Sequence, residues 1–105
     1  MDPSQNPTRS GFEDILTPWL KKHGLPIPRV NVYLNGYEVD AYFEAEDLVL
    51  ELDGWEFHNA RDSFQSDRER DAHHLAHGTP TVRITPERLS DREAERLART
   101  LSIRR

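Results

Sequence analysis

The sequence predicts an α/β fold in which helices flank a mixed sheet of about four strands. Three observations predict this class. Short β-like runs fill residues 30–53, apolar residues at helical spacing follow capping sequences, and a strand, helix, strand order occupies the second half. That order implies a parallel, right-handed connection. At 105 residues the chain is long enough for one modest core, with residues 1–9 as a flexible lead-in and residues 10–105 as a single domain.

The first helix is predicted from a capping box, Ser10-Gly11-Phe12-Glu13, and from apolar side chains spaced three and four positions apart. It should end near Gly24, and Pro18 is expected to kink it. The apolar positions of this helix are Phe12, Ile15, Leu16, Trp19 and Leu20.

Three β-like runs are predicted to form an antiparallel meander: residues 30–34, 37–43 and 48–53. Asn35-Gly36, the strongest short-range hairpin signal, pairs Leu34 with Tyr37 and places Asn31 opposite Asp40. The four-residue connection 44–47 pairs Phe43 with Leu48. One face then carries Val30, Val32, Leu34, Tyr37, Val39, Ala41, Phe43, Leu48, Leu50 and Leu52. The other carries Asn31, Tyr33, Glu38, Asp40, Tyr42, Val49, Glu51 and Asp53.

The second half of the chain is predicted to contain a helix, a strand and a final helix. A second capping box, Ser66-Asp67-Arg68-Glu69, opens a helix that runs to about His77 and stops at Gly78. Residues 79–84 resemble a fourth strand, and residues 85–87 begin a single helical turn. A third capping box, Ser90-Asp91-Arg92-Glu93, opens the last helix, with Ala94, Leu97, Ala98 and Leu101 along one face.

The composition is 35% hydrophobic and 31% charged, so the core must be small and the surface heavily ionised. Because the chain has no cysteine, a disulfide framework and thiolate metal sites are excluded. No apolar run approaches the roughly 20 residues that span a membrane, and the N-terminus is polar rather than signal-like. A cytoplasmic location and no membrane partner are therefore expected.

The net charge of −5 argues weakly against a nucleic-acid partner. Its distribution is uneven, since residues 1–60 hold 4 Lys/Arg and 11 Asp/Glu whereas residues 61–105 hold 10 and 8. Much of the negative charge falls on the predicted meander and its connection. The charge therefore predicts feeble non-specific DNA binding rather than the absence of a DNA substrate.

Two carboxylates are predicted to face each other across the meander. The register that pairs Phe43 with Leu48 places Asp40 opposite Glu51, with Asp53 two residues on and facing the same way. Directly opposed Cβ atoms lie about 4.5–5.5 Å apart, and like charges there are destabilising. A hard divalent cation, Mg²⁺ or Mn²⁺, would explain why the chain keeps them. The alternative is a half-solvated sheet with an acidic outer face.

Several of these residues, taken in chain order, resemble a known family. They are Glu13, Leu25-Pro26, Asn31, Val39-Asp40, Glu51-Leu52-Asp53-Gly54, His58, Asp67-Arg68-Glu69-Arg70-Asp71, Gly78 and Val82-Arg83-Ile84-Thr85. The family is a bacterial group of endonuclease-like domains related to the very short patch repair endonuclease, within the PD-(D/E)XK restriction-endonuclease-like superfamily. The resemblance runs from about Arg9 to Leu101 and implies a metal-dependent phosphodiesterase fold that acts on DNA.

The resemblance also implies roles for individual residues. Asp40 resembles the first metal aspartate of the superfamily, and Glu51 resembles the acidic residue of the (D/E)-X-K pair. Asp53 stands where that pair has lysine, which implies either a two-metal site or a site that has lost activity. Glu13 resembles the acidic residue that the first helix brings to the metal, although the third helical position of a capping box favours glutamate in any case.

His58 resembles the general-base histidine of the repair endonuclease, and Asp71 resembles the carboxylate that orients it. A neutral imidazole near pH 7 can deprotonate water, and an acidic partner fixes its tautomer; the alternative is a surface histidine. Arg83 and Arg70 are the candidate DNA contacts. Arg83 could instead neutralise the acidic cluster, and Arg70 could form helix-surface ion pairs with Asp67 and Asp71.

Two functions follow as expectations. The first is a Mg²⁺- or Mn²⁺-dependent DNA endonuclease that hydrolyses phosphodiester bonds. The second is a nuclease fold that has lost catalysis and serves as a DNA- or protein-binding regulatory module of a larger protein. The lysine position held by Asp53, the acidic surface and the short chain favour the second.

Overall fold

The computed structural model describes the backbone of residues 7–53 and 60–105, and the side chains of residues 14–53 and 67–105. The elements follow in the order α1 (Pro7–Lys22), β1 (Arg29–Leu34), β2 (Tyr37–Phe43), β3 (Leu48–Leu52), α2 (Ala60–Ala76), β4 (Thr81–Ile84), η1 (Pro86–Arg88) and α3 (Asp91–Arg104). The strands form one sheet in the order β1-β2-β3-β4, antiparallel except for the parallel β3–β4 pair. The predicted α/β class and mixed four-strand sheet are confirmed.

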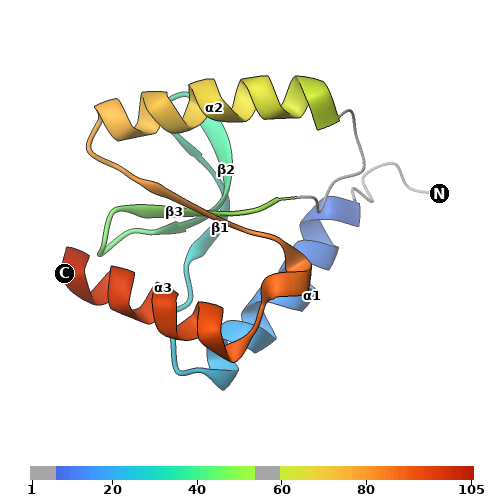
Figure 1. Cartoon of the computed structure of the whole chain (residues 1–105), viewed down its shortest axis with the longest axis vertical. Coiled ribbons are helices and arrows are strands. Elements are labelled where there is room, and N and C mark those ends of the chain that lie inside the picture. Colours follow the sequence, from blue (N-terminus) through green and yellow to red (C-terminus); the bar gives the residue numbers. More distant parts are fainter. Residues whose placement is uncertain (1–6, 54–59) are drawn as a thin grey trace.

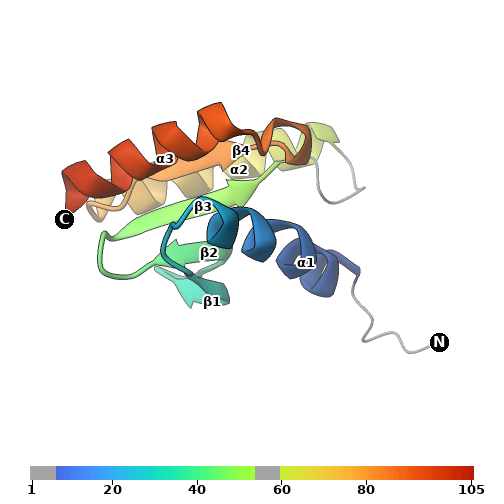
Figure 2. The ribbon, with the colours of Figure 1, turned by 90° about the horizontal axis from the view of Figure 1, so that it is seen from below.

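The sheet lies between two helical layers. Helix α2 runs along one face, and α1 and α3 lie against the other (Figure 1; Figure 2 shows α1 and α3 from their own side). The main apolar core fills the α1/α3 side, where strand residues such as Phe43 and Leu50 pack against Leu16 of α1 and Leu97 of α3. None of the described helices has both the length and the apolar character needed to cross a bilayer.

The register of the meander matches the sequence prediction. Leu34 pairs with Tyr37, Phe43 with Leu48, and Ala41 with Leu50. The first hairpin turns through Asn35 and Gly36, whose φ angles of 52° and 88° are the pair of positive values that a type I′ turn requires. This turn fixes which residues of β1 and β2 lie side by side, and the four-residue connection 44–47 does the same for β2 and β3.

Strand β3 is buried on both faces, and this differs from the alternative of a half-solvated sheet. The crossover through α2 places that helix over the face that carries Val49 and Glu51, which are 0% and 6% exposed. Strand β4 then covers the edge of β3. Tyr37 also departs from the prediction, because its ring packs against His73 and His74 of α2, with centroid separations of 5.4 and 5.8 Å, rather than into the main core.

Two helices begin earlier than predicted. Helix α1 starts at Pro7, inside the predicted lead-in, and α2 starts at Ala60, six residues before the Ser66 capping box. Proline suits the first turn of a helix because its missing N–H needs no partner there. The capping-box pattern is compatible with a helix interior, so it cannot by itself mark a start. The helix start at the third box is confirmed, since the Ser90 hydroxyl accepts a hydrogen bond from Glu93 N at 3.2 Å.

Candidate functional site

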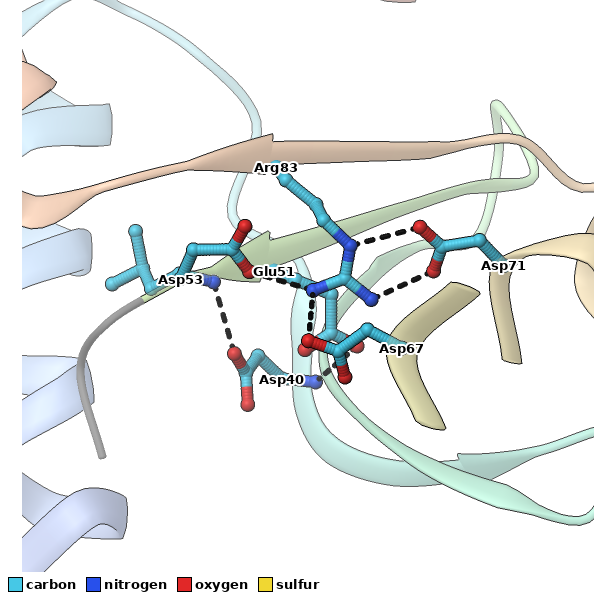
Figure 3. Close-up of polar contacts among 7 residues, drawn as sticks. Asp40, Glu51, Asp53, Asp67, Asp71 and Arg83 are labelled. Carbon is cyan, nitrogen blue, oxygen red and sulfur yellow. Dashed lines mark hydrogen bonds and ion pairs between the residues drawn. The ribbon is translucent and has the colours of Figure 1, made fainter. Parts of the chain in front are cut away.

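The candidate site is built on the middle of the sheet, where Asp40 of β2 and Glu51 of β3 lie one position beyond the Ala41–Leu50 pair. Each carboxylate reaches a main-chain N–H of the neighbouring strand. Leu52 N donates to Asp40 Oδ2 at 3.0 Å, and Asp40 N lies 3.4 Å from Glu51 Oε2 (Figure 3). The two acids are therefore neighbours on adjacent antiparallel strands, as the turn lengths predict.

Burial sets the charge state of this pair. Glu51 is 6% exposed, and its burial, with the negative charge of Asp40 second, raises the pKa of its carboxyl group to about 9. A hydrogen bond to Asp40 acts in the same direction, while Arg83 and Arg70 act against it. At neutral pH the Glu51 carboxyl of the metal-free site is therefore protonated, and it can donate the hydrogen bond that it forms with Asp40.

Arg83 is the centre of the second half of the site. It lies opposite Glu51 in the β3–β4 pairing, so its side chain emerges beside the acidic pair. Arg83 Nε and Nη2 donate to the two oxygens of Asp71 at 2.8 and 2.7 Å, which is a bidentate contact. Arg83 Nη1 donates to Asp53 Oδ1 at 2.6 Å and lies 3.4 Å from Asp67 Oδ2 (Figure 3). One guanidinium thus links β4 to the end of β3 and to two successive turns of α2.

The site carries more negative than positive charge. Figure 3 draws five acids, Asp40, Glu51, Asp53, Asp67 and Asp71, around the single guanidinium of Arg83. Arg70 contributes a second positive charge near Glu51 and Asp67, and its guanidinium lies 5.6 Å from the Tyr37 ring centroid. Burial raises the pKa of Asp67, against the opposite effect of Arg83. Even with Glu51 protonated, four carboxylates face two guanidinium groups.

The predicted site residues fall into three groups. Asp40, Glu51, Asp53, Asp71 and Arg83 come together, while Arg70 lies at the edge of the cluster over Tyr37. His58 and the side chain of Glu13 lie outside the described residues, so the predicted contact between His58 and Asp71 stays a prediction. Asp71 gives both of its oxygens to Arg83. In the described part of the chain no group of three or more histidine, aspartate or glutamate side chains is arranged to hold a metal ion.

Asp67 belongs to the site, although the sequence analysis gave it only a role in helix-surface ion pairs and none in catalysis or metal binding. It lies one helical turn before Asp71, so both carboxylates project from the same side of α2 toward Arg83. The i, i+4 spacing of the two acids is the available signal. That spacing suggests an ion pair with Arg70 of the same helix, whereas the fold brings Arg83 of β4 to within 3.4 Å of Asp67 and 2.7 Å of Asp71.

The histidines of α2 pack around the first hairpin. His74 is fully buried, and the Asn35 side-chain amide donates to its Nδ1 at 3.2 Å, while His74 Nε2 has no hydrogen-bond partner among the described residues. His73 Nε2 lies 3.0 Å from the Asn35 carbonyl oxygen, and His77 Nδ1 lies 2.9 Å from the His73 carbonyl oxygen. These contacts are those of a helix docked on a turn.

His74 should make stability depend on pH. Burial, with His73 second, lowers the pKa of its imidazole below the usual 6.5, so the unfolded chain binds the proton more readily than the folded chain. The stability that neutral, buried His74 contributes is complete above pH 6.5 and is lost as the pH falls through the folded-state pKa of its imidazole. We expect the loss of urea stability between pH 7.5 and 5.5 to be smaller in His74→Gln than in the wild type. The exposed His77, changed to Gln, is the control. An unchanged pH slope in His74→Gln would contradict this.

Comparison of the chain with protein-family models, with curated proteins and with solved structures yields no match. Function is therefore inferred from the geometry of the site and from the resemblance of the motifs given above.

Proposed function

We propose that this chain is a divalent-metal-dependent DNA endonuclease with a restriction-endonuclease-like fold. The observation that carries the proposal is the Asp40–Glu51 pair, in which a buried glutamate and a half-buried aspartate lie side by side on adjacent strands beside Arg83. Opposed acids are costly unless a proton or a cation lies between them. The four-strand mixed sheet, with both acids on its central strands, is compatible with the superfamily fold that the motifs imply.

The donor set of the pair suits Mg²⁺ or Mn²⁺. Both residues offer carboxylate oxygens, which hard divalent cations prefer, and no cysteine sulfur is available. Asp40 Oδ2 and Glu51 Oε2 contact main-chain N–H groups. A bound ion would take the place of the proton in the hydrogen bond between the two carboxyl groups. Asp40 and Glu51 would hold the metal, and Glu13 is a candidate further ligand. Asp53, the other ligand that the sequence suggests, already accepts a hydrogen bond from Arg83. A bound divalent ion supplies Lewis acidity toward a phosphate oxygen and lowers the pKa of bound water.

The remaining residues would prepare the site for a phosphodiester. Arg83 holds the end of β3 against α2 and keeps a positive charge beside the acids. His58, if it lies at the site, would accept a proton from the attacking water, and the ordinary pKa of an imidazole suits that role near neutral pH. Because the metal-free site is strongly acidic, a DNA phosphate would be repelled from it. The metal should therefore be required for DNA binding at this site and not only for cleavage.

The test is plasmid cleavage with Mg²⁺ or Mn²⁺. We expect the wild type to nick or linearise plasmid DNA and Asp40→Ala to be at least about a hundredfold slower, since it loses a metal ligand. Glu95→Ala is the matched control, because Glu95 is an exposed acid on α3, across the sheet from the site. Equal cleavage by wild type and Asp40→Ala would contradict the assignment of Asp40.

A regulatory module without catalysis is the second candidate. The observation that favours it is that Asp53, in the lysine position, is already bound to Arg83 at 2.6 Å. A ligand that binds only the folded state raises the melting temperature by mass action. A nuclease site should therefore raise the Tm of the wild type as millimolar Mg²⁺ or Mn²⁺ is added. A flat titration would favour the binding module.

A further inference from the structure

The position of Arg83 bears on how many metal ions this site can hold. Asp53 would be the obvious ligand for a second ion, since it follows Glu51 by two residues along the chain. Its Oδ1, however, accepts the 2.6 Å hydrogen bond from Arg83 Nη1. Its backbone N–H donates to Ile84 O at 2.9 Å, which fixes the residue beside the strand that carries Arg83.

The guanidinium of Arg83 is itself firmly held. Two hydrogen bonds to Asp71 set the plane of the group, and the ion pair with Asp67 lies on the same nitrogen that binds Asp53. The Arg83 side chain is 19% exposed, so water screens its charge only in part. A divalent ion bound to Asp53 or Asp67 would lie next to this positive charge. Repulsion between the two cations, together with the loss of the Arg83 contacts, opposes such binding.

We propose that Arg83 is a positioning residue that keeps Asp53 and Asp67 from binding metal, so that the Asp40–Glu51 pair takes one divalent ion rather than two. The inference rests on the proposed metal site at Asp40 and Glu51. Asp53 is then not a ligand, although it occupies the lysine position of the motif. The fixed positive charge that a lysine would bring there comes instead from β4, through Arg83, which pairs with Glu51 across the β3–β4 ladder.

The test measures metal binding without DNA, by isothermal titration and electron paramagnetic resonance with Mn²⁺ on the full chain. We expect the wild type to bind one Mn²⁺, and Asp53→Asn to bind one Mn²⁺ with a Kd within about threefold of the wild type. Asp40→Asn should weaken binding by about tenfold or more, because it removes a charged ligand. Arg83→Gln should bind a second Mn²⁺, and Asp53→Asn added to that variant should remove the second site.

Arg96→Gln serves as the matched control, because Arg96 is an arginine of α3 in a surface ion pair with Glu93 at 3.3 Å. This variant should still bind one Mn²⁺. If circular dichroism shows that Arg83→Gln does not fold, the Mn²⁺ affinity of Asp53→Asn alone tests whether Asp53 is a ligand. A Kd raised by about tenfold in that variant would make Asp53 a ligand and overturn the inference.

Two ions on the wild type would also overturn the inference, yet would leave the proposed function standing. No Mn²⁺ binding by the wild type at millimolar concentration would overturn both proposals together.

Discussion

Replacing Arg83 with methionine is expected to destabilise the metal-free chain by about 2–3 kcal/mol at pH 7. The substitution keeps much of the side-chain volume but leaves Asp53, Asp67 and Asp71 without their shared cation. Removing one partner of a buried ion pair costs about 3–5 kcal/mol. The expected value is lower because the three carboxylate side chains are 29–41% exposed and therefore partly screened by water. Urea denaturation at low salt measures the change.

The control for this experiment is Arg96→Met. The Arg96 side chain is 61% exposed, so loss of its surface pair with Glu93 should change stability by less than about 0.5 kcal/mol. A double-mutant cycle tests the coupling between Arg83 and Asp71. The double variant Asp71→Asn, Arg83→Met should lose less free energy of unfolding than the sum of the losses in the two single variants. A loss below about 1 kcal/mol for Arg83→Met would mean that the network of carboxylates does not hold the strands to α2.

Replacing Glu51 with glutamine should have the opposite effect and stabilise the metal-free chain by about 3 kcal/mol at pH 7. The folded-state pKa of Glu51, about 9, lies above its ordinary value of 4.5, so the folded chain binds this proton more tightly than the unfolded chain. The stability that protonated Glu51 contributes is complete below pH 4.5 and is lost as the pH rises through 9. Glutamine keeps the donor toward Asp40 without a charge and should remove this loss.

The measurement is the free energy of unfolding in urea at several pH values from 5 to 9, in the absence of divalent metal. Stability of the wild type should fall across this range relative to Glu51→Gln, and the two curves should converge toward low pH. Glu95→Gln, at an exposed position on α3, is the control and should follow the wild type. The same Glu51→Gln variant should fail to cleave DNA under the proposed function. Parallel curves for wild type and Glu51→Gln would show that Glu51 is ionised in the folded chain.

The elements that the sequence predicts correctly are those whose signals are local. Asn35-Gly36 and the four-residue connection after Phe43 specify the register of the meander, because a short turn allows few ways to join two strands. Turn lengths are therefore enough to place Asp40 beside Glu51. Ser90 and Gly78 likewise mark one helix start and one helix end, Ser90 through its hydroxyl group and Gly78 through its backbone N–H, each bonded to a residue three positions away.

Other features depend on contacts between distant segments, and local patterns do not predict them. The start of α2 at Ala60 is one example, since the capping pattern at Ser66 is equally compatible with a helix interior. The burial of Glu51 is another, because it requires α2 to cover the face that alternation alone leaves open to water.

The amino-acid sequence alone thus specifies the sheet, its register and the adjacency of Asp40 and Glu51, because turn lengths and side-chain alternation act over short stretches of chain. The tertiary fold was needed to show that Arg83 binds Asp53, 30 residues away, and Asp71, 12 residues away. The sequence leaves two roles open for Arg83, a phosphate contact or neutralisation of the acids, and its contacts in the folded chain are those of the second. The physical reason is that an ion pair forms wherever the fold brings opposite charges together out of water, and that placement follows from how β4 and α2 dock on β3.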